Sequence, residues 1–220
     1  MFEGRKFKAE AKEQLKGNWK VPALITFIVF LLQGLVSGTQ RTVYHTETLY
    51  GSSVSVTISI VGTIVNGILT LAMVYYYINL KKDKANTTFH TFLDGLNMWF
   101  KGMCAQLWQS LWIFLWILLL IIPGIVKAFA YSQMFYILAE NPTMSVRKAM
   151  KISMAMTKGA KGDLFVMGFS FIGWVLLGII TLGIGFLWII PYMNLAFTNC
   201  YAYLKEDAIR RNVLTAEDFI

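Results

Sequence analysis

The sequence predicts an all-α integral membrane protein with six transmembrane helices, arranged as three hairpins that each follow an amphipathic helix on the cytoplasmic side. Composition, the length of the apolar runs and the distribution of basic residues support this prediction. Of the 220 residues, 56% are hydrophobic and 15% are charged, whereas soluble domains carry about 25% charged residues. Lipid is therefore the expected solvent, and in lipid only helices and closed barrels satisfy every backbone hydrogen bond.

The apolar runs favour helices over barrel strands. A barrel strand alternates between its two faces over about ten residues, but these runs are continuous and about twice as long. We expect residues 1–220 to form a single membrane domain. Its six predicted spans are residues 22–38, 60–80, 105–122, 125–139, 164–180 and 186–204.

The chain begins with a basic segment in which apolar residues recur at near-helical spacing. Among the first twenty residues, six are Lys or Arg, a pattern typical of an amphipathic helix on a membrane surface. The recurring apolar residues are Phe2, Phe7, Ala11 and Leu15. Pro22 then suits the first turn of the first span.

From Thr39 to Ser59 the chain is polar and β-branched, and residues 54–59 alternate apolar and polar side chains, a pattern that allows a small extracytoplasmic β-hairpin before the second span. The second span ends in Tyr75, Tyr76 and Tyr77 just before Lys81 and further lysines. Such an aromatic belt followed by positive charge marks the cytoplasmic end of a span.

Residues 88–100 predict a second surface helix, and the third span follows and stops at Pro123-Gly124. Residues 105–139 can form a hairpin or one helix kinked at the proline. We favour the hairpin, because a single helix of this length would measure about 52 Å, beyond a hydrocarbon core of about 30 Å.

A third surface helix is predicted over residues 146–157, with Ser145 as its N-cap. The fifth and sixth spans follow, joined by a glycine-containing turn, and Pro191 can kink the sixth. Eighteen of the twenty Lys and Arg residues lie outside the spans on one predicted side, and only Arg41 and Lys127 do not. The positive-inside rule therefore places both termini in the cytoplasm. The net charge of +8 follows from this topology and not from a nucleic-acid-binding patch.

Three Lys-Gly pairs suggest an internal repeat of surface helix and hairpin. The pairs are Lys16-Gly17, Lys101-Gly102 and Lys158-Gly159. A repeat predicts three parallel hairpins around a pseudo-threefold axis, a geometry that can enclose a cavity. The alternative is that any membrane hairpin entered through a basic interface shares this layout.

Four segments resemble a known family. They are Leu118-Leu-Leu-Ile-Ile-Pro-Gly-Ile-Val-Lys127, Tyr136-Ile-Leu-Ala-Glu-Asn-Pro142, Phe171-Ile-Gly-Trp-Val-Leu-Leu-Gly178 and Thr181-Leu-Gly-Ile-Gly-Phe-Leu-Trp188. The chain is similar to the bacterial membrane family called domain of unknown function 975, and more distantly to the membrane domain of some glycerophosphodiester phosphodiesterases. The resemblance implies a bacterial plasma membrane protein with no established activity, and it supplies no catalytic residue.

Lys127, Asn66, Gln133 and Asn194 are the candidate ligand-binding residues, because all four lie within apolar spans. A lysine in an apolar run must reach water, a lipid phosphate or a partner, so Lys127 either snorkels to the interface or contacts an anion. The three amides either form interhelical hydrogen bonds, worth about 0.6–2 kcal/mol each, or line a polar pathway.

No enzyme, cofactor or metal site is expected. The sequence has no HExxH, P-loop or GxSxG motif, and Cys104 and Cys200 have neither metal-ligand nor redox spacing. We therefore predict a non-catalytic membrane protein that binds lipids of the anionic inner leaflet or a membrane-protein partner, with no nucleic acid. The alternative is a transporter or facilitator of a lipid-like or small amphiphilic solute, for which Lys127, Asn66 and Gln133 would line one cavity.

Overall fold

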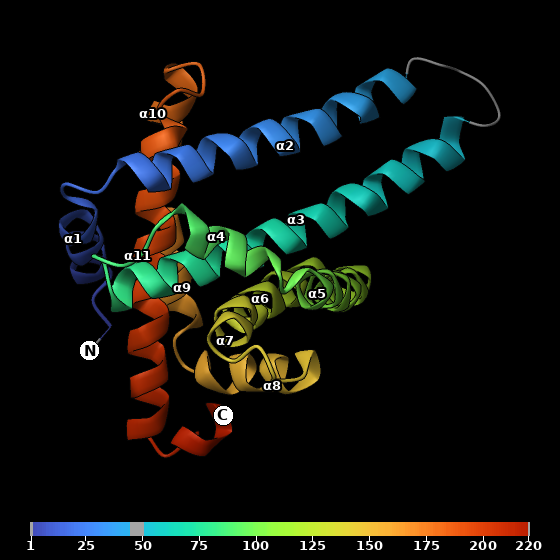
Figure 1. Cartoon of the computed structure of the whole chain (residues 1–220). Coiled ribbons are helices and arrows are strands. Elements are labelled where there is room, and N and C mark those ends of the chain that lie inside the picture. Colours follow the sequence, from blue (N-terminus) through green and yellow to red (C-terminus); the bar gives the residue numbers. More distant parts are fainter. Residues whose placement is uncertain (1, 45–50, 220) are drawn as a thin grey trace.

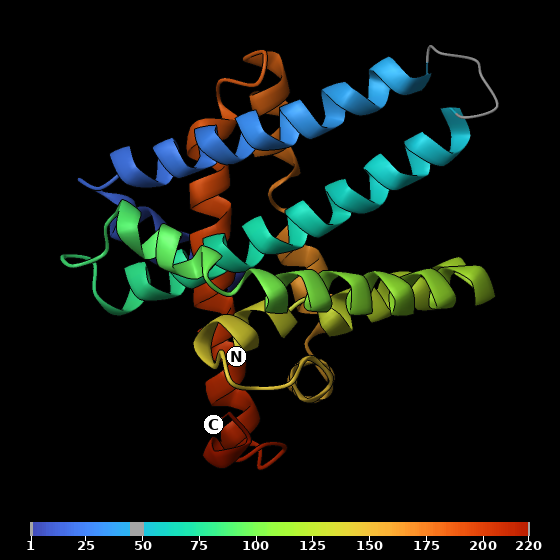
Figure 2. The same ribbon diagram turned by 45° about the vertical axis from the view of Figure 1, so that its right-hand side comes forward.

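The computed structural model describes the backbone of residues 2–44 and 51–219, and the side chains of residues 2–35 and 60–219. Within these ranges the chain forms helices and no strands, as the fold class predicted. Figures 1 and 2 show long helices that extend from a common packed region.

The first three helices are α1 (Gly4–Leu15), α2 (Lys20–Tyr44) and α3 (Gly51–Lys82). Phe7, Ala11 and Leu15 form the buried stripe of α1, as their spacing predicted. Because α2 continues to Tyr44 and α3 already begins at Gly51, with residues 54–59 inside it, the β-hairpin considered between Thr39 and Ser59 is wrong within the described residues, which exclude 45–50. A helix longer than the apolar span continues through these β-branched residues, and it satisfies their backbone groups without a partner strand.

The next four helices are α4 (Phe89–Leu96), α5 (Trp99–Leu119), α6 (Ile121–Tyr131) and α7 (Met134–Glu140). The chain reverses at Leu120, which has extended backbone angles, and α6 returns beside α5. A Cβ atom on Gly124 would lie 2.5 Å from Ile117 Cγ1, so glycine permits this close approach. The break therefore falls three residues before the predicted Pro123-Gly124, because proline fits the first turn of α6 without losing a hydrogen bond.

The last helices are α8 (Val146–Met156), α9 (Lys161–Phe169), α10 (Ile172–Ile180), α11 (Phe186–Arg210) and the short 3₁₀ helix η1 (Ala216–Phe219). Ser145 is the N-cap of α8 as predicted, and its side chain accepts a hydrogen bond from the Lys148 backbone N–H at 3.3 Å. Pro191 lies inside α11.

Residues of α3, α7 and α11 form the centre of the protein. Nearly all of α7 is buried, together with the facing parts of α3 and α11. From this centre, α2 and α3 extend in one direction and α5 and α6 in another, while α10 and α11 run at a steep angle to both (Figures 1 and 2). The three helix pairs thus diverge, whereas the repeat predicted parallel hairpins.

Four helical segments of the described chain are long and apolar enough to span a membrane. They are Ile60–Lys82, Trp99–Leu119, Ile121–Glu140 and Lys161–Ile180. A fifth would be the pair Gly4–Leu15 and Lys20–Leu35, which is bent by 103°. The count is lower than the six predicted spans. Among the six, α11 is not a candidate, because Asn194, Asn199 and several tyrosines interrupt its apolar residues.

Candidate functional site

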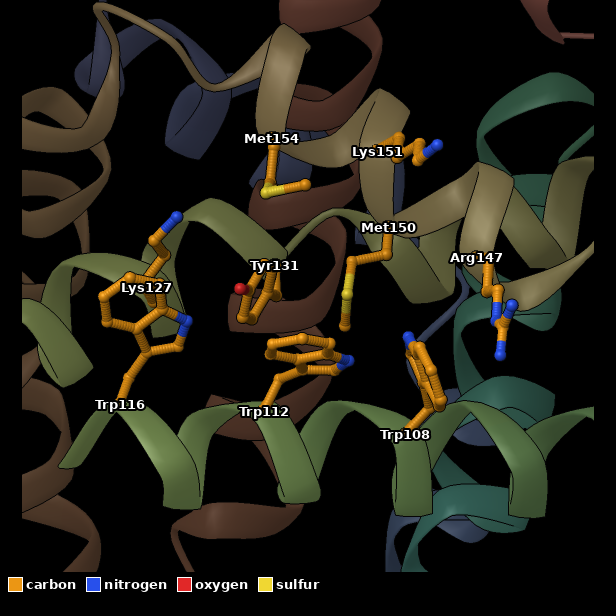
Figure 3. A pocket seen from close by; sticks show the side chains of 9 residues that line it. All are labelled: Trp108, Trp112, Trp116, Lys127, Tyr131, Arg147, Met150, Lys151 and Met154. Carbon is orange, nitrogen blue, oxygen red and sulfur yellow. The ribbon is translucent and has the colours of Figure 1, made fainter. Parts of the chain in front are cut away.

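Three tryptophans on one face of α5 form the floor of a cavity of about 570 Å³. Trp108, Trp112 and Trp116 are four residues apart, so they project from the same side of the helix (Figure 3). The rings of Trp108 and Trp112 meet edge to face, with centroids 5.9 Å apart. α5 thus presents a continuous aromatic strip.

Three cationic side chains surround this strip. Lys127 of α6 places its Nζ atom 4.6 Å from the ring centroid of Trp116, and the Arg147 guanidinium of α8 lies 4.9 Å from that of Trp108. Lys151 also lines the cavity. Each cation–π contact of this kind contributes about 0.5–1 kcal/mol where water has access.

The cavity has no negative charge to balance these cations. No carboxylate is among its nine lining residues. Within the part of the chain that the structure describes, none of Lys127, Arg147 and Lys151 forms an ion pair. An anion that enters the cavity would therefore meet cationic side chains and no carboxylate along its lining.

Apolar side chains complete the cavity. Met150 and Met154 of α8 and Tyr131 of α6 stand opposite the tryptophans (Figure 3). Methionine is flexible and polarisable, so it adapts to chains of irregular shape. The site therefore combines three cations with an aromatic and thioether surface, a composition that suits an anionic amphiphile.

Hydrogen bonds across the break between α6 and α7 hold α8 in place. The Ser153 hydroxyl donates to the Ala130 carbonyl at 2.7 Å and accepts from the Gln133 backbone N–H at 3.2 Å. Lys101 of α5 donates to the Pro142 carbonyl in the segment before α8. Figure 2 shows α8 nearly end-on while α5 runs across the view, so α8 lies across the α5/α6 pair and closes one side of the cavity.

The four predicted ligand-binding residues do not meet at this cavity. Lys127 lines it, and the other three are not among its lining residues. Asn66 is exposed and accepts a hydrogen bond from Thr70 at 3.3 Å, and Asn194 donates to the Ile190 carbonyl in its own helix at 3.0 Å. Gln133 is 2% exposed and donates to the Ser132 hydroxyl at 2.9 Å. These amides bond locally.

Sequence reasoning missed the aromatic strip and two of the three cations. The i, i+4, i+8 spacing of Trp108, Trp112 and Trp116 was a readable signal for one helical face. The contribution of Arg147 and Lys151 was not readable, because it depends on how α8 folds back across α5.

A second charged cluster lies at the centre of the protein. Glu140, the last residue of α7, accepts a hydrogen bond from the Tyr201 hydroxyl at 2.6 Å and pairs with Lys205 at 2.7 Å, both on α11. Lys82, the last residue of α3, lies 3.5 Å from its other carboxylate oxygen. Tyr136 stacks on Tyr201 with ring centroids 5.3 Å apart. This cluster ties the ends of α3 and α7 to α11.

The described residues contain no group of three or more His, Cys, Asp or Glu side chains that could hold a metal ion. His45 lies outside the described residues. The cations and rings of the cavity give the candidate chemistry, which is the recognition of an anion next to an apolar surface.

The described chain is an apolar helical protein with several helices long and apolar enough to span a membrane. Its cavity combines cationic and aromatic side chains. The family model described as "Protein of unknown function (DUF975)" matches residues 1–129 and 117–208. The chain belongs to this family. No curated protein and no solved structure matches the chain, and the distant similarity to the membrane domain of glycerophosphodiester phosphodiesterases stays a prediction.

Proposed function

We propose that this protein is a non-catalytic integral membrane protein that binds an anionic phospholipid in the cavity between α5, α6 and α8. The observation that carries the proposal is the set of three cations without counter-ions, Lys127, Arg147 and Lys151, around three tryptophans. A lipid phosphate supplies the missing negative charge, and its glycerol and upper acyl chains match the indole and thioether surface.

The proposed location is a bacterial plasma membrane with both termini in the cytoplasm. Four segments of 20–23 residues satisfy the length and hydropathy of a span, and the distribution of basic residues supports the orientation. The proposal keeps six spans, with α2 and α11 as the additional two. A central helix such as α11 tolerates asparagines because it faces protein, and Asn199 is buried there.

Electrostatics favour an anionic over a zwitterionic lipid. A basic residue near the cytoplasmic leaflet contributes about 1 kcal/mol of attraction to anionic lipid. Tryptophan prefers the membrane interface, where its apolar ring and polar N–H are both satisfied. Both preferences support an anionic lipid as the ligand of this cavity.

Binding is better supported than transport of an amphiphilic solute. A transport pathway of the kind considered from the sequence needs Asn66 and Gln133 to face the same cavity as Lys127. Instead, both amides have local hydrogen-bond partners, and the cavity is lined by aromatic, thioether and cationic side chains.

Native mass spectrometry of the detergent-solubilised protein tests the proposal. Phosphatidylglycerol should remain bound at detergent concentrations that strip phosphatidylcholine. The variant with Lys127→Ala, Arg147→Ala and Lys151→Ala, here called the cavity triple, should lose that preference. The control triple, with Lys16→Ala, Lys20→Ala and Lys158→Ala, removes the same charge from exposed positions away from the cavity and should retain it. Equal retention of both lipids by the unaltered protein contradicts the proposal.

A further inference from the structure

A short helix followed by long apolar helices occurs three times along the chain. α1 precedes α2 and α3, α4 precedes α5 to α7, and α8 precedes α9 to α11. Each short helix packs on the last helix of the unit before it: α4 on α3, and α8 on α7. α1 closes the circle by packing on α11, beside which it lies in Figure 1. Such cyclic packing is the arrangement that a threefold internal repeat produces.

The first and third short helices correspond residue by residue. Ala149 follows Phe7 by 142 positions (149 minus 7), and the same separation relates Arg147 to Arg5. It also relates Gly159 to Gly17, which have φ angles of +91° and +80°. The buried stripes coincide as well: Phe7, Ala11 and Leu15 in α1, and Ala149, Ser153 and Thr157 in and directly after α8.

This correspondence identifies a second groove. Since α8 closes the first cavity against α5 and α6, α1 should close a matching one against α9, α10 and α11. Two cavities lie there, one of about 410 Å³ beside Arg5 and Lys8, and one of about 320 Å³ beside Lys12. Lys8 and Lys12 are one helical turn apart, so the cavities follow each other along α1.

The second groove repeats the pairing of cations with aromatic rings. The Lys8 Nζ atom lies 4.0 Å from the ring centroid of Phe171 and donates to the Ser170 carbonyl at 3.1 Å. Trp174 and Tyr192 meet edge to face with centroids 5.7 Å apart, and both line the cavity beside Lys12. Partial burial lowers the pKa of Lys8 below its usual value, so a nearby anion would stabilise its charged form.

The two grooves differ in one respect, and the middle unit differs from both. Asp163 lines the second groove near Arg5 and Lys8, whereas the first cavity has no acid. The middle short helix, α4 (Phe89–Leu96), contains no Lys or Arg. The repeat therefore supplies a cationic wall twice, in α1 and α8.

We infer that the groove along α1 is a second binding site for an anionic phospholipid. Arg5 and Lys8 face the phosphate, Lys12 adds charge one turn further on, and Trp174 and Tyr192 lie beside the glycerol and acyl chains. The inference rests on the proposed function for the ligand class, but its site shares no residue with the first cavity.

The number of retained lipids tests this inference. In native mass spectrometry with phosphatidylglycerol, the unaltered protein should retain two lipids. The variant with Arg5→Gln and Lys12→Gln leaves the Lys8 contact with Ser170 intact and should retain one, with the second binding step weakened by about tenfold. Asp163→Asn removes the one acid of this groove and should strengthen the same step. The control triple should still retain two.

Each outcome decides between the two proposals. One lipid in the unaltered protein, lost in the cavity triple and unaffected by the α1 substitutions, overturns the second site and leaves the proposed function standing. No preference for phosphatidylglycerol over phosphatidylcholine at any step overturns both. Loss of one lipid in each variant, and of both when the substitutions are combined, supports both.

Discussion

The charged cluster at the centre of the protein and the cavity on α5 use their charges in opposite ways. In the centre, the Glu140 carboxylate is 18% exposed and is shared by Lys82, Lys205 and a tyrosine hydroxyl. Around the cavity, Lys127 and Arg147 lie over aromatic rings, Lys151 is a third cation, and no carboxylate is among the lining residues. A charge that is paired within the fold stabilises the fold, whereas cations gathered without counter-ions leave an anion to be supplied from outside. The pairing of charges, and not their number, separates structural from binding residues in this fold.

Removal of the central charge should produce the largest effect. Glu140→Gln retains a hydrogen-bond partner for Tyr201 but leaves Lys205, which is 25% exposed, without its counter-ion. We expect the free energy of unfolding to fall by about 2 kcal/mol, because loss of one partner uncovers the desolvation cost of the other, reduced here by partial exposure. Thermal unfolding of the detergent-solubilised protein, followed by circular dichroism, measures the change.

Glu13→Gln is the matched control for Glu140→Gln. Glu13 is an exposed residue of α1, so its substitution should leave the unfolding temperature unchanged. At temperatures where both variants are folded, their retention of phosphatidylglycerol should equal that of the unaltered protein. If Glu140→Gln lost as much phosphatidylglycerol as the cavity triple, the distinction between the two charged regions would be wrong.

A substitution in the aromatic strip should weaken lipid binding and leave stability nearly unchanged, the reverse of Glu140→Gln. Trp112 is 36% exposed at the middle of the strip, and Trp112→Ala removes contact area for a ligand but little from the protein core. We expect affinity for phosphatidylglycerol to fall by about tenfold, the effect of losing about 1.4 kcal/mol, with a small change in the unfolding temperature. Trp99→Ala, at a position 54% exposed and outside the cavity, is the control and should bind normally.

Local features of the fold were predictable because they depend on neighbours in sequence. The spacing of Phe7, Ala11 and Leu15 predicted the buried face of α1, and Ser145 was recognised as an N-cap. The reversal between α5 and α6 was predicted, but its position was placed three residues too late, because Pro123-Gly124 has the sequence of a turn but fits the start of a helix. The alternation over residues 54–59 favoured a strand, and the longer helix α3 overrode it.

The candidate site was predictable only in part, because it joins residues from three helices. Lys127 was predicted as a candidate ligand-binding residue because it is a lysine within an apolar run. Its neighbours Arg147 and Lys151 are brought to the cavity by the hydrogen bonds of Ser153 across the α6–α7 break, and no pattern within α8 encodes them. The Lys-Gly pairs predicted a repeat that relates α1 to α8, but the packing of each short helix on the unit before it depends on tertiary contacts that the sequence does not give.

The smallest predicted effect separates snorkelling from binding at Lys127. Lys127→Gln should weaken phosphatidylglycerol binding by about threefold, since one of three cations is lost near the surface, and should leave phosphatidylcholine binding unchanged. Lys127→Arg should restore the affinity, because a guanidinium keeps both the charge and the stacking on Trp116. A lysine that only snorkels would also tolerate arginine, so Lys127→Gln is the decisive variant. Lipid binding that is identical in Lys127→Gln and the unaltered protein, measured at low ionic strength where screening is weakest, would remove Lys127 from the site and leave the cation–π contact as a structural one.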